Sequence, residues 1–339
     1  MKTRYPLRGS AIPRNKELAK KTLRHIKLEF GAAVEPFTLH LPLPELFAGA
    51  WMACRESLLA GSVRRDVKEA VASTVSLINR CPYCVDAHNI MMLAFSGRDY
   101  SSQILEGRYD DIDDPEIGNA AKWAAATLSP GSSLLFSPPF SAREAPEYIG
   151  TAVLFHYINR MVTILLGASP LPFRRGILKR LSQRMAVLFF SKAVRLKKEP
   201  CTSLDLLPAS DLPPDLDWSK PSPCIAGAYA AFSRAVDHAG EAVLSEPLRA
   251  SVSGALDAWD GRAFGPQLPT DCISNYSGPE RIAGEMALLS ALAPYRVTER
   301  MMEDFVSCYP ADEQLLAVLA WGSFSAARRI GRWIGGVET

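Results

Sequence analysis

The sequence has little of the charge that marks nucleic-acid-binding proteins and no long uninterrupted apolar run of the kind that marks membrane proteins. Its net charge is only +2 over 339 residues, which argues against a polyelectrolyte contact with nucleic acid and against electrostatic membrane binding. The most apolar stretch, residues 149–166, is interrupted by His156, Asn159 and Arg160, which favours a buried helix over a membrane span. With 48% hydrophobic and 22% charged residues, the composition is that of an ordinary globular protein, and its length suffices for two domains.

Cysteine is also scarce, and the seven cysteines lack the even spacing of a disulfide framework. The N-terminal residues have no apolar core of the kind a signal peptide needs. We therefore expect a reducing, cytoplasmic setting. Cys224, Cys272 and Cys308 carry no motif and are predicted to serve in packing. Cys54 lies on an apolar helical stripe and is predicted to be a small buried residue.

Reactive groups are instead concentrated between residues 69 and 88, with the sequence EAVASTVSLINRCPYCVDAH. Apolar residues recur at helical spacing over 64–79, and the pattern then breaks at an Asn-Arg-Cys-Pro sequence. Proline suits the first turn of a new helix, which is predicted to run over about 81–95 and to stop near Gly97. The stretch is thus predicted to form two helices with a short break between them.

The second helix is predicted to place Cys81, Cys84 and His88 on one face, since their positions fall within a stripe roughly 60° wide. Residues three apart have Cβ atoms about 5–6 Å apart, close enough for a disulfide after a small adjustment. Exposed N–H groups in the first turn favour a thiolate, and His88 is placed to act as a base or proton relay for Cys84. The first interpretation is therefore a redox-active dithiol.

Other interpretations of the same residues remain open at this point. Cys81, Cys84, His88 and Glu69 would make four zinc ligands, although structural zinc sites usually combine two separated pairs and no second pair is present. The letters CPYC also match the glutaredoxin active site, but that fold needs a strand before the motif. Taken alone, Glu69 lies opposite the apolar stripe of its helix and is predicted to be a solvated glutamate.

The spacing Glu, eleven residues, Cys-x-x-Cys, three residues, His resembles the signature of the alkylhydroperoxidase D and carboxymuconolactone decarboxylase family. The segments PELFAGAWMACRESLLAG and GRD are similar to sequences of its peroxidase-related branch. The resemblance covers roughly residues 35–170. It implies an all-helical, oligomer-forming fold in which Cys84 attacks a peroxide and Cys81 resolves it as a disulfide. Glu69 and His88 would form the proton relay. Some peroxidases of this family have a histidine where this chain has Tyr83.

A long apolar helix predicted over residues 145–167 carries two further candidates, His156 and Arg160. By itself, His156 is typical of a satisfied core histidine. The resemblance implies that a helix with this aromatic and Asn-Arg pattern packs against the dithiol. His156, Arg160 and Tyr83 are therefore possible supporting residues, and Arg160 is a candidate to hold a carboxylate such as that of Glu69.

Composition divides the chain into four parts. Residues 1–45 are basic and then proline-spaced, and are interpreted as an arm or short helix with an extended lead-in. Residues 46–199 form the catalytic helical domain, in which 174–198 is predicted to be a basic surface helix. Residues 200–223 contain six prolines and are interpreted as an interdomain linker. Residues 224–339 form a second helical domain.

The second domain is interpreted as a degenerate copy of the first. FAGAWMACRESLL at 47–59 aligns with IAGAYAAFSRAVD at 225–237, and three further matches follow in the same order with similar spacing. The copy has Ala250, Arg262, Gly265, Gly322 and Ala326 at the positions of Glu69, Cys81, Cys84, His156 and Arg160. We expect a duplicated all-α bundle whose second half replaces the neighbouring subunit of a simpler oligomer.

Three functions are carried forward from the sequence. The first is a peroxidase that needs no metal, haem or flavin, and whose dithiol is regenerated by an external dithiol. The second is a decarboxylase-like enzyme acting on a small organic acid, with His88 and Glu69 as acid and base. The third is an interaction protein in which the dithiol senses oxidation or holds zinc. A homo-oligomer is possible, and neither nucleic acid nor membrane is expected as a partner.

Overall fold

The regular secondary structure is helical in the residues that the computed structural model describes, 15–166, 198–264 and 268–336, which confirms the all-α prediction. The helices of the first half are α1 Lys16–Phe30, α2 Glu35–Thr38, α3 Pro44–Cys54, α4 Arg65–Ile78, α5 Pro82–Ser96, α6 Ser101–Leu105, α7 Pro115–Ala125, α8 Ser133–Phe136 and α9 Ala145–Leu165. Those of the second half are α11 Pro223–Glu241, α12 Glu246–Asp257, α13 Gly278–Leu292, α14 Glu299–Cys308 and α15 Asp312–Ile334.

The two helices predicted around the dithiol are present with nearly the predicted boundaries. The pattern over 64–79 corresponds to α4, and the one over 81–95 corresponds to α5. Pro82 occupies the first turn of α5, where its missing N–H costs no helical hydrogen bond. The helix ends at Gly97, whose φ of 71° is the left-handed conformation that glycine adopts without strain.

The N-terminal segment departs from its prediction. A helix, α1, is present and is capped by the side chain of Asn15. The extended lead-in was wrong, because Pro36 lies within the first turn of a second short helix, α2, and the chain then turns into α3. The basic helix predicted for 174–198 lies outside the described residues, apart from Lys198.

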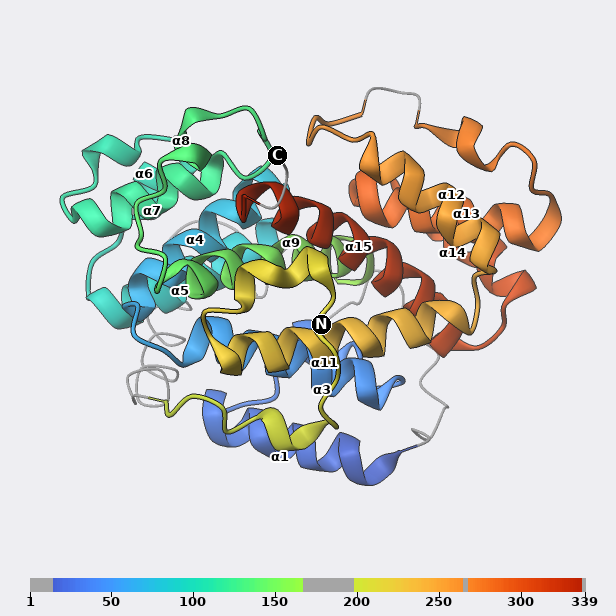
Figure 1. Ribbon diagram of the computed structural model, residues 1–339, viewed down its shortest axis with the longest axis horizontal. Helices are drawn as coiled ribbons and strands as arrows, with labels where there is room; N and C mark the ends of the chain where they lie inside the picture. Colours follow the sequence, from blue (N-terminus) through green and yellow to red (C-terminus); the bar gives the residue numbers. More distant parts are fainter. Residues whose placement is uncertain (1–14, 167–197, 265–267, 337–339) are drawn as a thin grey trace, which may run out of the picture.

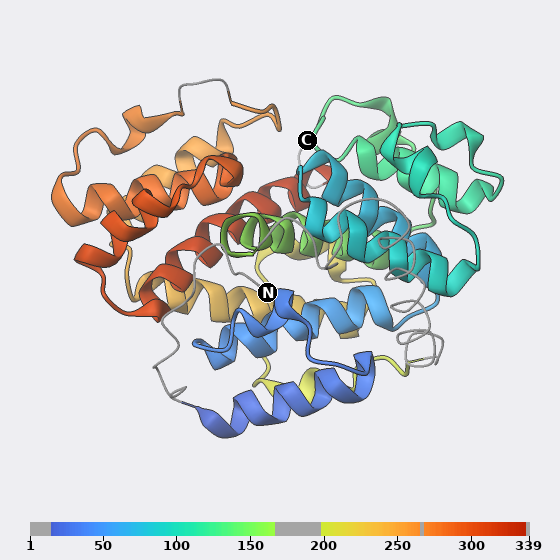
Figure 2. The ribbon, with the colours of Figure 1, turned by 180° about the vertical axis from the view of Figure 1, so that it is seen from behind.

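Two pairs of helices from different halves of the chain form the middle of the molecule (Figures 1 and 2). Helix α3 lies beside α11, and α9 lies beside α15. Helices α4 to α8 extend to one side of these pairs, and α12 to α14 extend to the other. Almost every side chain of α9 is buried, as predicted. None of the helices within the described ranges is long and apolar enough to cross a membrane.

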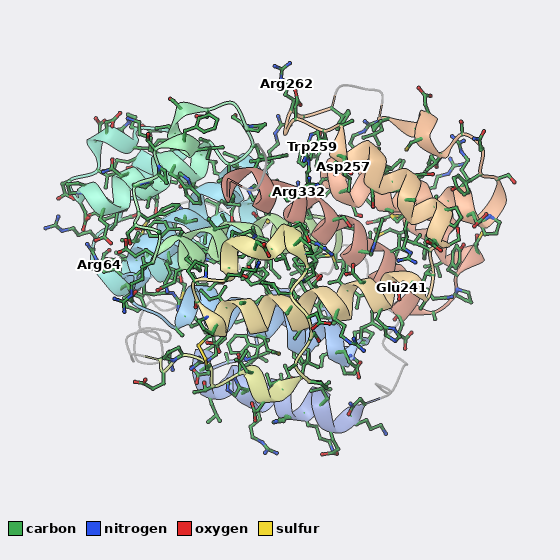
Figure 3. All side chains as sticks on the ribbon, viewed as in Figure 1. Arg64, Glu241, Asp257, Trp259, Arg262 and Arg332 are labelled. Atoms are coloured by element: carbon green, nitrogen blue, oxygen red, sulfur yellow. A yellow bond between two sulfur atoms is a disulfide. The ribbon has the colours of Figure 1, made fainter. Side chains whose placement is uncertain are left out.

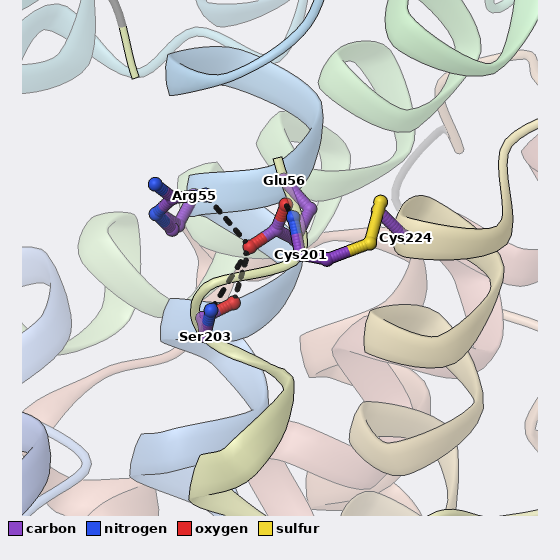
Figure 4. The surroundings of a disulfide bond; sticks show 5 residues. All are labelled: Arg55, Glu56, Cys201, Ser203 and Cys224. Atoms are coloured by element: carbon purple, nitrogen blue, oxygen red, sulfur yellow. Dashed lines mark hydrogen bonds and ion pairs between the residues drawn. A yellow bond between two sulfur atoms is a disulfide. The ribbon is translucent and has the colours of Figure 1, made fainter. Parts of the chain in front are cut away.

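Residues 198–223 are packed against both halves of the chain. Leu216 and Trp218 are buried, and Cys201 forms a disulfide with Cys224 at the start of α11. The carboxylate of Glu56 accepts hydrogen bonds from the Cys201 amide at 2.7 Å and from the Ser203 hydroxyl at 2.6 Å (Figure 4). The prediction that Cys224 serves only in packing was therefore wrong. Its pairing depends on how the chain folds back, which the spacing of the cysteines does not show.

Candidate active site

The turn between α4 and α5 places both cysteines of the CxxC motif at the start of α5. Arg80 has a φ of 56°, unusual for a residue other than glycine, and lets the chain reverse between the helices. The Cys81 amide donates to the Ser76 carbonyl at 2.9 Å, and Cys81 caps α5. Both thiols are reduced and buried, and their Sγ atoms are 2.8 Å apart. The predicted dithiol is thus within bonding reach.

The two thiols have opposite pKa shifts. Burial raises the pKa of the Cys81 thiol, but hydrogen bonds from Cys84 and from the amides of the first helical turn outweigh it, so the net pKa is lowered. Burial raises the pKa of the Cys84 thiol, and the neighbouring Cys81 sulfur raises it further. The pair therefore holds a negative charge on Cys81 more readily, and Cys84 keeps its proton until a base removes it.

Glu69 and His88 are in direct contact, one from each helix of the hairpin. The His88 Nδ1 lies 2.5 Å from the Glu69 Oε2. Since an ionised carboxylate only accepts hydrogen bonds, Nδ1 carries the proton, and Nε2 is left free to accept one. The prediction that Glu69 is solvated was wrong, because α5 covers the polar face of α4 and buries Glu69 completely.

Arg65 is a site residue that the sequence analysis missed. Its guanidinium contacts the Oε1 of Glu69 at 2.5 and 2.6 Å, and the side chain is buried. Burial raises the pKa of Glu69, but the charge of Arg65 and then the interaction with His88 lower it by more, so the carboxylate stays ionised. The Arg-Glu spacing of four residues on a predicted helix was the available signal.

A cavity of about 240 Å³ opens beside these residues. Cys84, His88 and Glu69 form its polar end, and Cys81 is not among the described residues that line it. Apart from Glu35 and the phenol of Tyr83, the rest of the wall is apolar. The Phe155 ring packs edge-on against His88 at a centroid distance of 4.2 Å. The cavity is therefore suited to an apolar molecule that presents one reactive polar group to Cys84.

The N-terminal segment supplies one wall of this cavity. Phe30, Val34, Pro36 and Phe37 line it, together with Glu35. The Tyr83 hydroxyl donates to the Glu35 carboxylate at 3.1 Å, which ties the residue between the two cysteines to α2. Burial and the Glu35 charge raise the pKa of Tyr83, so its phenol remains protonated at neutral pH. Tyr83 thus forms part of the cavity wall, a role that its position in the motif did not predict.

The two candidates on α9, His156 and Arg160, do not line the cavity at Cys84. His156 is fully buried and is hydrogen-bonded to Asn79 and Thr127, as a satisfied core histidine is. Burial and the nearby Arg160 lower its pKa, so it is neutral. Arg160 donates to the backbone carbonyls of Ala291 and His156. The suggestion that Arg160 holds the Glu69 carboxylate was wrong. The carboxylate is paired with Arg65, which lies on the same helix as Glu69.

Asn159, between these two residues, is a residue of α9 that contacts the dithiol. Its side chain donates to Ser76 at 3.0 Å and accepts from Asn79 at 3.0 Å. It also hydrogen-bonds Cys84, which partly offsets the rise in the pKa of that thiol. The packing of this helix against the dithiol thus includes Asn159 beside Cys84 and Thr163, which hydrogen-bonds Cys81.

The described residues contain no group of three or more histidine, cysteine, aspartate or glutamate side chains arranged to hold a metal ion. His88 directs its Nδ1 to Glu69, and Glu69 is also paired with Arg65. The four residues considered as zinc ligands therefore contact each other as two pairs, Cys81 with Cys84 and Glu69 with His88.

No family model matches the chain. It is 38% identical over 317 residues to an alkyl hydroperoxide reductase of Mycobacterium tuberculosis, a match that covers 91% of this chain and 88% of that protein. The chain belongs to the alkylhydroperoxidase D family. The family inferred from residues 69–88 and their surroundings is thereby confirmed.

The likeness extends well beyond the stretch that suggested it. The sequence resemblance to the alkylhydroperoxidase D family was specific over roughly residues 35–170, whereas the match with the mycobacterial protein covers 91% of the chain. The segment after residue 200, including the half that lacks the dithiol, is therefore shared with this member of the family.

Proposed function

We propose that this protein is a thiol-dependent peroxidase that reduces an uncharged organic hydroperoxide through Cys84 and Cys81. The observation that carries the proposal is that Cys84 and the Glu69–His88 pair open onto one apolar cavity. The name of the mycobacterial relative, alkyl hydroperoxide reductase, supports the same reaction class. The apolar lining favours a substrate with an alkyl or aryl body over hydrogen peroxide.

In the first step, Cys84 transfers its proton to Nε2 of His88, and the Glu69 carboxylate stabilises the imidazolium that forms. The Cys84 thiolate attacks the terminal oxygen of the hydroperoxide. The S–O bond forms as the O–O bond breaks, and the departing alkoxide takes the proton from His88 as an alcohol. Cys84 is left as a sulfenic acid.

In the second step, the Cys81 thiolate attacks the Cys84 sulfur. A disulfide forms, and hydroxide leaves and is protonated to water. The lowered pKa of Cys81 suits this role, since it favours the thiolate form that attacks the sulfenic acid. An external dithiol then reduces the disulfide to two thiols and is itself oxidised to a disulfide, which completes the cycle.

The roles of Cys84 and Cys81 are tested with single-cysteine variants. Each protein is treated with one equivalent of cumene hydroperoxide in the presence of dimedone and then analysed by peptide mass spectrometry. We expect the wild type to form a Cys81–Cys84 disulfide within seconds. Cys81→Ser should accumulate the dimedone adduct on Cys84, and Cys84→Ser should stay reduced. An adduct on Cys81 in Cys84→Ser would reverse the two roles, and a wild type that stays reduced would refute the peroxidase proposal.

The decarboxylase-like alternative has less support from the cavity. Its described lining contains Glu35 and Glu69 but no lysine or arginine. The carboxylate of a small organic acid would therefore have no counter-ion there apart from a protonated His88. No contact of the described residues specifically favours the redox-sensing alternative.

A further inference from the structure

A second, smaller cavity lies where the turn before Cys81 meets the second half of the chain. Its volume is about 90 Å³, enough for a few water molecules or one small ion. Ile78, Asn79 and Arg80 come from the first half of the chain. The second half contributes Trp259, Gly261, Arg262, Ala263, Leu292, Pro294 and Tyr295. It shares no described residue with the cavity at Cys84 and has no part in the proposed peroxidase cycle.

Three arginines line this cavity, and the described lining contains no aspartate or glutamate. Arg80 is exposed, and its guanidinium lies over the Tyr295 ring, 5.5 Å from the centroid. Arg262 is also exposed, and its side chain points outward at the edge of the molecule in Figure 3. Its backbone carbonyl accepts a hydrogen bond from the Trp259 indole at 2.9 Å. It pairs with Asp260 at 3.2 Å, but Asp260 is not part of the lining.

Arg160 is the buried member of the three, with only 4% of its surface exposed. Its Nε and Nη1 donate to the carbonyls of Ala291 and His156 at 2.8 and 2.6 Å, and its guanidinium lies 5.9 Å from the centroid of the Trp259 ring. No carboxylate of the described residues forms an ion pair with it. The guanidinium therefore has neutral partners only, although a buried charge is costly without a counter-charge.

Burial lowers the pKa of Arg160 to about 10, the direction expected when a charged group is not compensated. An oxyanion beside the guanidinium would offset this cost. Arginine presents parallel N–H donors whose geometry matches the oxygens of a carboxylate or phosphate. The charge and burial of Arg160 and the small size of the cavity thus all indicate a small oxyanion as the ligand.

The walls of the cavity are held in place by close backbone packing. Gly261 has a φ of 84°, and a Cβ at this position would lie 2.2 Å from the Leu128 carbonyl oxygen. Only glycine fits such an approach, so residues 259–263 lie directly on the segment after α7. On the opposite wall, Asn79 is hydrogen-bonded to Asn159, which itself contacts Cys84.

We propose that this cavity binds a small oxyanion, a phosphate or a carboxylate group, between Arg160 at its floor and Arg80 and Arg262 at its rim. The site is formed jointly by the two halves of the chain. It is independent of the peroxidase proposal, since none of the three arginines acts in that cycle.

The proposal is tested by calorimetric titration of the full-length protein with sodium phosphate and, separately, with sodium acetate, at pH 7.5 and an ionic strength held constant with sodium chloride. We expect saturable binding of at least one of the two anions, with one site per chain. Tighter binding of phosphate would identify a phosphate group as the ligand, and tighter binding of acetate a carboxylate.

Variants locate the binding. Arg160→Met and Arg80→Ala should each weaken the affinity about tenfold or more, because each removes a charge-assisted contact. Arg108→Ala serves as the control, since Arg108 is a half-exposed arginine paired with Glu106 and Asp111. If Arg160→Met does not fold, the exposed Arg80 and Arg262 decide the question by Arg80→Ala and Arg262→Ala. No saturable binding, or an affinity unchanged by these substitutions, would overturn the proposal.

Discussion

Arg65 and Glu69 show how one arginine sets the chemistry available to a neighbouring histidine. Glu69 is completely buried, and without a counter-charge its pKa would rise. With Arg65 bound to one oxygen, the carboxylate stays ionised and its other oxygen accepts the Nδ1–H of His88. In the proposed cycle, Arg65 is a positioning residue that acts through Glu69 on His88.

Replacement of Arg65 should therefore change how activity depends on pH. In the wild type, activity that requires ionised Glu69 is present above its lowered pKa and is lost as pH falls through that pKa. Arg65→Met removes the largest effect that opposes burial, so the pKa of Glu69 rises and the acid limb of kcat/KM for cumene hydroperoxide moves to higher pH. We expect about a tenfold loss at neutral pH, a part of what general acid–base catalysis contributes.

Arg65→Lys is the matched control, because it retains the charge and should keep the acid limb near its wild-type position. If Arg65→Met had the wild-type pH profile, Glu69 would not depend on Arg65 for its ionisation. A profile shifted equally by both substitutions would indicate that the guanidinium geometry matters and the charge alone does not.

At the scale of helices, a second buried ion pair fixes α4 against α9. The Lys68 ammonium contacts Glu147 at 2.7 Å and the Ala60 carbonyl at 2.6 Å. Glu147, at the start of α9, also accepts from the amides of Ser62 and Val63. The pair therefore holds α4, the loop before it and α9 together, which keeps α4 and its Glu69 in place beside the cavity.

Glu147→Gln should destabilise the protein by about 3–5 kcal/mol, because it leaves the ammonium of Lys68 buried without a counter-charge. The free energy of unfolding is measured by urea denaturation. Glu116→Gln is the control, since Glu116 pairs with Arg64 at the surface and its loss should cost less than about 1 kcal/mol. Equal effects of the two substitutions would contradict the role assigned to the buried pair.

The Cys201–Cys224 disulfide joins the segment after residue 198 to the first turn of α11. Cys201 is exposed, so a reductant can reach the bond. The bond closes a loop between Cys201 and Cys224, which are 23 residues apart in the sequence. For a loop of this length, the lost chain entropy of the unfolded state corresponds to about 3 kcal/mol of stabilisation. We expect the double variant Cys201→Ser/Cys224→Ser to be less stable by about this amount in urea denaturation.

Cys272→Ser is the control for this prediction, because Cys272 is a free and partly exposed cysteine. It should leave the unfolding free energy nearly unchanged. The double variant should still form the Cys81–Cys84 disulfide with peroxide, since neither of its cysteines lines the cavity. A double variant as stable as the wild type would show that the bond does not constrain the fold.

At the scale of the molecule, helices of the two halves meet in equivalent pairs. Helix α3 packs on α11 and α9 packs on α15, and these are the helices that carry the first and last of the matching sequence segments. We propose that the chain arose by duplication, with the second half in the place of a neighbouring subunit. Two homologous subunits related by a twofold axis would bring the same helices together.

Two glycines at matching positions of this duplication test the packing between α3 and α11. A Cβ on Gly49 would lie 2.8 Å from the Cα of Phe232, whereas a Cβ on Gly227 would lie 3.4 Å from the Leu204 side chain. Gly49→Ala should therefore force the helices apart and destabilise the protein by about 1–3 kcal/mol. Gly227→Ala should be neutral or slightly stabilising, since alanine favours a helix. Similar unfolding free energies for both variants would contradict this close approach.

The sequence was sufficient for the features that depend on neighbours along the chain. Helical periodicity, Pro82 and Gly97 define α4 and α5, because these signals act through local backbone geometry. The spacing of Cys81, Cys84 and His88 placed them on one helix for the same reason. Together with the position of Glu69, this spacing also identified the family.

What only the tertiary structure decided depends on how helices pack. Whether Glu69 is solvated follows from α5 lying on the polar face of α4. That Arg160 does not pair with it follows from the contacts of Arg160 with Ala291 and His156. The pairing of Cys201 with Cys224 and the wall that the N-terminal segment adds to the cavity likewise join residues distant in sequence. Periodicity shows which faces of a helix are polar. It does not show what covers them, because burial and charge pairing arise from contacts between segments that the linear pattern leaves unspecified.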